Sequence, residues 1–415
     1  MTMKITLPTY LIKIMKILEN ANEEVYLVGG FVRDMVMHKP YHDYDLTTSA
    51  HPDKMIQLFQ SLGYSLILTG KQHGTIIIQI NNKLIEITTY RIELNYKNYR
   101  SPDTIIFADN IYEDLKRRDF TINAMAYHPL HGIIDPFQGQ TDIKHQIIKA
   151  VGDPFLRLQE DALRILRAIR FECCFSFRIE IQTTQAIIQY AHLLTHISKE
   201  RIQQEFYKML TSPQQDFIQL LNYYHVLPYI FTPFSNTLTH QVIQQIDHIL
   251  NRSIHQSFLI RFTTILYGLL PYHSMDTMIL YLQEMKYSKK SIQHIKTILT
   301  YHTYDTHSIS ALRKLLFMNL NEFSVVEDII HFQYVIQTIS LHEYQNSLSL
   351  FNTIKQNNDI FYKSDLAING HDLLAFGYHG KQIHDVLQFL YELVIENPSL
   401  NTRQSLLSYI SNHLN

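Results

Sequence analysis

The chain has 415 residues, of which 46% are hydrophobic and 18% are charged, so it is long enough for more than one domain. Its 36 Lys and Arg residues nearly balance its 38 Asp and Glu residues, for a formal net charge of −2. This excludes a protein that attracts a polyanion such as nucleic acid by its overall charge. Binding of a polyanion would need a local patch of positive charge. The only cysteines, Cys173 and Cys174, are adjacent, which does not suit an ordinary disulfide or a zinc site and favours a reducing cytoplasm.

The first 25 residues alternate apolar residues with Lys, Glu and Asn, which predicts an amphipathic helix and not a signal peptide. No apolar run approaches the roughly 20 residues needed to span a bilayer. Up to about residue 150, β-rich segments such as "EVYLVGG", "GTIIIQI" and "KLIEITTY" alternate with helical stretches, whereas the pattern from Phe155 onward is almost entirely helical. We therefore expect an α+β N-terminal region followed by an all-α remainder, with the boundary near residues 152–154.

The segment "KPYHDYDLTT" (residues 39–48) places Asp43 and Asp45 two positions apart. On a strand, residues i and i+2 share a face with Cα atoms about 6.5–7 Å apart, so both carboxylates would enter one space. Mg²⁺ prefers a few carboxylates together with phosphate oxygens and water, and a pair of such ions can support an in-line displacement. The alternative is a polar turn after Pro40 in which Asp45 caps a helix, and the short motif alone favours this turn.

The residues around the two aspartates point towards a phosphate site. In "VGGFVRD", Gly29 and Gly30 separate a strand from a helix, where the backbone can approach a triphosphate. Arg33 lies in the first turn of that helix, within reach of the same phosphates. Glu86 interrupts the β-branched run "KLIEITTYR", which makes it a candidate third carboxylate on a neighbouring strand; the alternative is a charge on an edge strand.

Six motifs in order resemble the class II nucleotidyltransferases, the family of bacterial tRNA nucleotidyltransferases (CCA-adding enzymes) and poly(A) polymerases. They are "GGFVRD…DYDLTTSAHP", "TGKQHGT", "EDLKRRDFTINAMAY", "IIDPFQGQTDI", "EDALRILRAIRF" and "ISKERIQQEFYKML". Together they cover about residues 25–210, and "INGHDLLAFGYHGKQI" and "NPSLNTRQSLLSYI" continue the resemblance more weakly. It implies a catalytic head (1–152), a helical neck with a base-reading helix (153–212), a helical body (213–300) and a helical, tRNA-binding tail (301–415).

The resemblance also implies a reaction. Asp43 and Asp45 would bind Mg²⁺ as the cofactor, with Glu86 as a further catalytic carboxylate. The 3′-hydroxyl of a tRNA would attack the α-phosphate of CTP or ATP, and pyrophosphate would leave. The expected partners are therefore tRNA, ATP and CTP in the cytoplasm, with no membrane, and a homodimer is left open.

Asp161 and Arg164 in "QEDALRILRAIRF" lie one turn apart on a predicted helix with an apolar stripe on another face. One interpretation is a solvated salt bridge worth roughly a few tenths of a kcal/mol. The other is base recognition, because a carboxylate accepts from the exocyclic amine of cytosine or adenine but meets a carbonyl on uracil or guanine. Such a site rejects the wrong base, since it leaves buried acceptors unpaired. The family uses this pair as its protein template, and the resemblance implies that role here.

Further polar residues are carried over from the same motifs. The family places arginines around the nucleotide and its triphosphate at the positions of Arg118, Arg167 and Arg170. Asp119 and Asn123 in "RRDFTIN" would either orient the nucleotide sugar or fix the loop.

We expect a structural role, as ion pairs that brace the neck, for Glu200, Arg201 and Glu205 in "ISKERIQQEF".

Three features favour a CCA-adding member of the family. "TGKQHGT" resembles the CCA-adding form, and no H…HD…D phosphohydrolase signature is present. The segment between Glu86 and the RRD motif has the full length of the loop that lets one site switch from C to A, although Asn98 and Ser101 stand where an acidic and a basic residue are expected. The alternatives are a CC-adding enzyme, a poly(A) polymerase or a catalytically inactive RNA-binding relative.

Overall fold

The computed structural model describes residues 7–41, 44–80, 83–97, 99, 101–319, 322–357 and 363–413. The chain divides into two compact units, Met1–Asn236 and Thr237–Asn415, which we call the N-terminal and C-terminal units. The N-terminal unit begins as an α+β head and continues as helices, and the described part of the C-terminal unit is helical, which confirms the predicted fold class. The finer division at residues 152, 212 and 300 stays a prediction.

A mixed seven-stranded sheet forms the centre of the head, in the order β3-β4-β5-β2-β1-β8-β9. Strand β2 runs parallel to β5 and antiparallel to β1. The bounds in sheet order are β3 (Ser65–Ile67), β4 (Thr75–Ile80), β5 (Lys83–Thr89), β2 (Asp45–Thr48), β1 (Val25–Val28), β8 (Ala126–His128) and β9 (Gly132–Ile134). A separate antiparallel hairpin joins β6 (Arg91–Lys97) to β7 (Ser101–Phe107).

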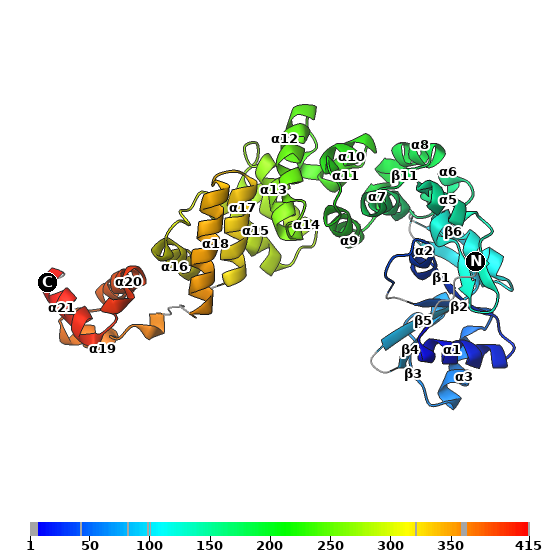
Figure 1. The fold of residues 1–415 in the computed structure, drawn as a ribbon, viewed down its shortest axis with the longest axis horizontal. Coiled ribbons are helices and arrows are strands. Elements are labelled where there is room, and N and C mark those ends of the chain that lie inside the picture. The colour runs from blue at the N-terminus through cyan, green and yellow to red at the C-terminus, as the bar shows by residue number, and fades with distance from the viewer. Residues whose placement is uncertain are drawn as a thin grey trace. The chain divides into compact units, whose positions relative to one another are not determined.

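One face of this sheet belongs to the core of the head. β-Branched residues alternate along β4 and β5, and Ile76, Ile78 and Ile87 on one face are fully buried, as expected for a strand with one covered face. Helices α1 (Thr9–Asn20) and α3 (Pro52–Ser61) bury amphipathic stripes and contact the sheet at β1, β3 and β4 (Figure 1). The opposite face holds the charged residues of the candidate site.

The other α-helices of the N-terminal unit lie in the predicted head, neck and body. They are α2 (Gly30–Val36), α4 (Ile111–Lys116), α5 (Gly139–His145), α6 (Pro154–Glu160), α7 (Leu163–Phe175), α8 (Ile181–Tyr190), α9 (Lys199–Leu210), α10 (Phe217–Tyr223) and α11 (Leu227–Ile230). Two-residue strands β10 (Ile147–Ile148) and β11 (Arg178–Ile179) pair in parallel. The almost entirely helical pattern predicted after Phe155 is confirmed, and β11 is a short exception, because two paired residues are too few to give a strand pattern in the sequence.

The C-terminal unit is built from ten α-helices in its described residues. They are α12 (His240–Leu250), α13 (Phe258–Leu269), α14 (Met275–Glu284), α15 (Lys289–Tyr301), α16 (Ile309–Met318), α17 (Phe323–Val335), α18 (Leu341–Gln356), α19 (Gly370–Ala375), α20 (Lys381–Glu396) and α21 (Arg403–His413). Helices α12 and α13 can approach closely because Gly268 has no side chain. A Cβ atom at this position would lie only 2.5 Å from Cγ1 of Ile246. Among the described residues, no helix is long and apolar enough to cross a membrane.

Candidate functional site

A carboxylate pair lies at the junction of β2 and β5. Asp45 is the first residue of β2 and is the register partner of Glu86 on β5, so both side chains project from the same face. Burial raises the pKa of Glu86 above its ordinary value, the negative charge of Asp45 raises it further, and Arg91 opposes the shift. Asp45 does not cap a helix, so that alternative was wrong. Asp43, the other predicted metal ligand, lies outside the described residues.

The predicted Gly-Gly turn lies directly beside Asp45. Strand β1 ends at Val28, which pairs with Asp45 in register, and Gly29 follows with φ +69, a conformation that favours glycine. A Cβ on Gly29 would lie 3.2 Å from Nη1 of Arg118. Glycine is therefore required here both by the turn and by the close approach of the arginine.

Two arginines of the RRD motif are bound to a buried acid of α4. Asp114 is fully buried and accepts from Arg117 at 2.8 Å and from Arg118 at 3.2 Å. Burial alone would raise the pKa of Asp114, but the two guanidinium groups outweigh it and lower the pKa below the ordinary value. Arg117 also binds Glu93 of β6 at 2.9 Å. Arg118 is therefore held at the cavity, and the hairpin is tied to the same motif.

A polar chain joins the RRD loop to α2 and α7. Asp119 accepts from Nε of Arg167 at 2.8 Å and from the side-chain amide of Asn123 at 3.0 Å. Asn123 in turn accepts from Arg33 at 2.9 Å. These contacts favour the role of Asp119 and Asn123 in fixing the loop; the alternative role towards the nucleotide sugar stays a prediction.

The predicted base-reading pair, Asp161 and Arg164, does not lie on one continuous helix. Helix α6 ends at Glu160 and α7 begins at Leu163, and Asp161 between them has extended φ and ψ of −136 and 103. Its carboxylate accepts from the backbone N–H of Leu163 at 3.1 Å, as at a helix start. The expected single helix was therefore wrong at its beginning, while the predicted apolar stripe of α7 is buried as expected.

Asp161 and Arg164 each have a strong partner elsewhere. Asp161 receives two hydrogen bonds from Arg201 of α9, at 3.2 and 2.9 Å. Arg164 donates to Glu160 at 2.7 Å and to the backbone carbonyls of Arg157 and Arg117 at 2.8 and 3.2 Å. The interpretation as a solvated salt bridge between Asp161 and Arg164 finds no support in these contacts, and both side chains are held in fixed positions.

The expected bracing by α9 is present. Arg201 binds Asp161 as described, and Glu205 accepts from Nε of Arg170 at 2.6 Å. Both pairs link α9 to the segment that carries the predicted base-reading residues. The contacts agree with the structural role predicted for Arg201 and Glu205.

One aromatic ring, which the sequence did not single out, lies among the arginines. The guanidinium carbons of Arg170, Arg33 and Arg167 lie 4.1, 5.3 and 5.7 Å from the ring centroid of Phe171. Cations over an aromatic face are attracted by its quadrupole. Phe171 therefore helps to hold three arginines that would otherwise repel one another.

Many of these groups line one cavity of about 370 Å³. Its lining contains eleven of the predicted site residues, which come from the Gly-Gly turn, β2, the RRD motif and α7; they are Gly29, Gly30, Arg33, Asp45, Arg118, Asp119, Asn123, Asp161, Arg164, Arg167 and Arg170. The sequence missed Glu93, Arg117 and Phe171 in this lining. Glu86 is not part of it. The (i, i+3) and (i, i+4) spacing from Asp114 to Arg117 and Arg118 would have indicated the acid–arginine cluster.

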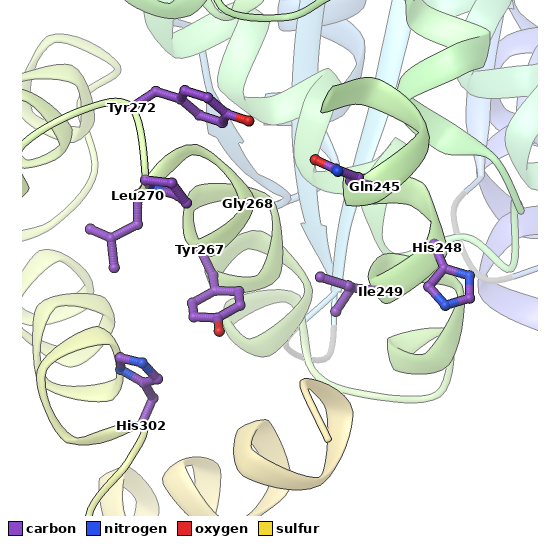
Figure 2. Close-up of a pocket in the computed structure, with 9 residues that line it drawn as sticks. Gln245, His248, Ile249, Tyr267, Gly268, Leu270, Tyr272 and His302 are labelled. Atoms are coloured by element: carbon purple, nitrogen blue, oxygen red, sulfur yellow. The ribbon is translucent and has the colours of Figure 1, made fainter. Parts of the chain in front are cut away.

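A cavity of about 540 Å³ lies in the C-terminal unit (Figure 2). Residues of α12 and α13 and of the segments that follow α13 and α15 line it; Tyr267 contacts His302 there with ring centroids 5.3 Å apart. Its lining contains no carboxylate and no arginine. The cavity in the N-terminal unit is therefore the candidate site for a charged nucleotide.

Asp119→Ala is expected to lower the free energy of unfolding by about 3–5 kcal/mol at neutral pH, because it leaves the half-buried Arg167 without its carboxylate. Burial alone would raise the pKa of Asp119, but Arg167 and Asn123 outweigh it and hold the pKa well below its usual range. The stabilisation is thus present above about pH 4, the ordinary pKa of Asp, and is lost as the pH falls through the lowered pKa. Urea unfolding across this range measures both effects.

Asp109→Ala, an exposed aspartate before α4, is the matched control and should change little. If the charge pair is responsible for the stabilisation, the double variant Asp119→Ala/Arg167→Ala should lose less free energy of unfolding than the two single variants lose in sum. A loss below about 1 kcal/mol for Asp119→Ala, or strict additivity, would contradict this account.

Three family models match the chain in order. The model described as "Poly A polymerase head domain" matches residues 25–149, "Probable RNA and SrmB- binding site of polymerase A" matches residues 176–237, and "tRNA nucleotidyltransferase domain 2 putative" matches residues 266–410. The first match contains the carboxylates and the RRD motif, and the third lies within the C-terminal unit.

Two curated relatives carry the name CCA-adding enzyme. The one from Lactobacillus helveticus is 48% identical over 211 residues, which is 50% of this chain and 52% of the relative. The one from a Geobacillus species is 46% identical over 200 residues, which is 48% of each chain. These sequence matches span about half the length of the curated relatives.

The structural match extends further along the chain. The crystal structure of the Bacillus stearothermophilus CCA-adding enzyme in complex with CTP is 26% identical, covers 99% of this chain and 98% of its own, and has a TM-score of 0.80.

Proposed function

The chain belongs to the tRNA nucleotidyltransferase and poly(A) polymerase family, and from this premise we propose that it adds CCA to the 3′ end of tRNA without a nucleic-acid template, using CTP and ATP and releasing pyrophosphate. The observation that carries the proposal is the cavity that gathers Asp45, the arginines and the Asp161–Arg164 pair. The likeness to a CCA-adding enzyme solved with CTP supports the same activity. We place this activity in the cytoplasm, in keeping with the two free cysteines.

The donor set at the sheet fits a divalent cation. Asp45 and Glu86 point their carboxylates from neighbouring strands to one face, and their mutual repulsion contributes to the raised pKa of Glu86. Cations relieve such repulsion, and hard carboxylate oxygens suit Mg²⁺. We propose that Asp43 and Asp45 hold Mg²⁺ with Glu86 beside it. When bound, the metal would neutralise charge at the reacting phosphate and favour the ionised 3′-hydroxyl.

The side chains of the cavity bind and orient the nucleotide in this proposal. Arg33, Arg118 and Arg167 surround the triphosphate, and the Gly29 turn lets it approach the backbone. Asp161 accepts from the exocyclic amine of cytosine or adenine, and Arg164 donates to the adjacent ring acceptor. In the reaction, a bond forms between the RNA 3′-oxygen and the α-phosphorus while the bond to the pyrophosphate oxygen breaks.

Asp161 can accept from a base without releasing Arg201. In the structure, its two oxygens accept from Arg201, and one of them also accepts from Leu163. A carboxylate has about four acceptor sites, so it can keep Arg201 and still accept from a base amine. Arg201 thereby fixes the direction from which the amine approaches.

A stepwise extension assay tests the function. Purified protein, Mg²⁺ and a tRNA lacking its last three nucleotides are given each nucleoside triphosphate singly and then CTP with ATP. We expect addition to stop after two C residues with CTP alone, and one A to follow when ATP is present. Long A tails would identify a poly(A) polymerase, a final stop at CC with both nucleotides a CC-adding enzyme, and no extension an inactive RNA-binding relative.

A further inference from the structure

An apolar strip lies on the sheet face that carries the candidate carboxylates. In register across the sheet, Asp45 pairs with Glu86, Glu86 with Ile77, and Ile77 with Ile67. Register partners point to the same face, and so does Leu84, two residues before Glu86 on β5. Ile67, Ile77 and Leu84, which we call the apolar strip, therefore continue the catalytic row towards the β3 edge.

Leu84 and Ile67 of the apolar strip are exposed and Ile77 is partly buried, unlike the isoleucines on the other face. The exposed fraction is 59% for Leu84 and 37% for Ile67, whereas Ile76 and Ile78 on the other face have none. Elsewhere this face is covered, since Thr47 of β2 contacts Asp114 of α4. Exposed apolar side chains that adjoin a charged site are typical of interaction surfaces.

The nucleotide cavity lies on the other side of Asp45. Its lining comes from the β1–α2 turn, the start of β2, β6, the RRD motif and the α6–α7 region, and it includes no residue of β3, β4 or β5. In an in-line displacement, the attacking oxygen and the leaving pyrophosphate lie on opposite sides of the phosphorus. If the triphosphate occupies the arginine side, the 3′-hydroxyl has to arrive from the side of β5 and the apolar strip.

We propose that the apolar strip is the docking surface for the last nucleotides of the RNA substrate. The inference rests on the proposed function, and it assigns to Ile67, Ile77 and Leu84 the contact with base and ribose faces. A single-stranded 3′ end presents such unstacked faces, and contact with them does not depend on base identity. The same surface can then serve ends that differ in sequence as the RNA grows.

Leu84→Ser tests this surface with the full-length protein. We expect the KM for a tRNA that lacks only its terminal adenosine to rise about fivefold, since part of a leucine side chain no longer contacts the RNA. The KM for ATP should stay within about twofold, because Leu84 is outside the nucleotide cavity. Leu84→Met, which keeps an apolar side chain, should restore the parent value. Leu130→Ser, at an 82% exposed leucine between β8 and β9, is the matched control.

Direct binding of the same RNA, measured by fluorescence anisotropy without nucleotide, separates this inference from the proposed function. If the parent protein extends no RNA, the proposed function fails, while weaker RNA binding by Leu84→Ser would still support the strip. An unchanged RNA KM and unchanged RNA binding in Leu84→Ser would overturn the inference. An equal rise in the ATP KM, or an equal effect of Leu130→Ser, would also overturn it.

Discussion

Asp45→Asn is expected to lower the rate of nucleotidyl transfer by roughly a thousandfold or more, while the protein stays folded. The expectation follows from the position of Asp45, which is exposed at the start of β2 beside Glu86 and lines the arginine-rich cavity. The substitution keeps the shape of the side chain and removes its charge. It should therefore weaken metal binding while leaving the packing of the protein unchanged. Single-turnover extension of a tRNA lacking its last nucleotide, with saturating ATP, measures the chemical step.

Asp53→Asn is the matched control, because Asp53 is a 78% exposed carboxylate that pairs with Lys71 on the far side of α3 from the core. Its transfer rate should equal that of the parent protein. Thermal unfolding of both variants should coincide with that of the parent. A folded Asp45→Asn protein that transfers at more than about a tenth of the parent rate would refute the assignment of Asp45 to the metal.

Arg164→Ala is expected to lower kcat/KM for both CTP and ATP by roughly a hundredfold. The kcat/KM values for UTP and GTP should then be close to those for CTP and ATP. Arg164 is held by Glu160 and by two backbone carbonyls, so its donors are fixed before the base arrives. Without them, the ring acceptor of cytosine or adenine loses its partner. Competition between CTP and UTP on a tRNA that lacks its last three nucleotides measures the selectivity.

A second substitution separates base reading from packing. Arg164→Lys keeps the charge but cannot reproduce the planar donors, so it should also relax the choice of base. Arg178→Ala, at an exposed arginine of β11, should leave the choice unchanged. Retained discrimination against UTP and GTP in both Arg164 variants would remove this residue from the template.

The sequence predicted the parts of the site that depend on local spacing. Gly29 with φ +69, Asp45 beside Glu86, and Arg167 on α7 lie where the motifs indicated. Each signal was contained in a few consecutive residues: a glycine at a strand end, a charge within a β-branched run, and an arginine at helical spacing from an apolar stripe. Such patterns are set by the periods of strand and helix, which the sequence carries directly.

The contacts that the sequence missed join residues far apart in the chain. Arg201 binds Asp161 from 40 positions away, and Arg117 binds Glu93 from 24 positions away. Neither pair has a spacing rule, since both are formed only when helices and the hairpin pack together. Phe171 could not be predicted for another reason. On an apolar helix, a phenylalanine that contacts three cations follows the same sequence periodicity as a phenylalanine in the hydrophobic core.

The break between α6 and α7 shows a further limit. Apolar periodicity continues across Asp161, so the sequence favours one helix, yet the chain is extended there. The aspartate forms hydrogen bonds with the next helical turn and with Arg201, and these contacts outweigh its modest helix propensity. Departures from local rules of this kind are common where side chains serve a site.

Phe171 and its arginines have a consequence for turnover. The cavity has six arginines against four carboxylates, so a chain with almost no net charge concentrates positive potential at one point. Under the proposed function, the attraction that gathers a triphosphate acts equally on the pyrophosphate left behind. The same charges thus capture the nucleotide and retain the product. Raised ionic strength would weaken the binding of the nucleotide and would also hasten the release of pyrophosphate.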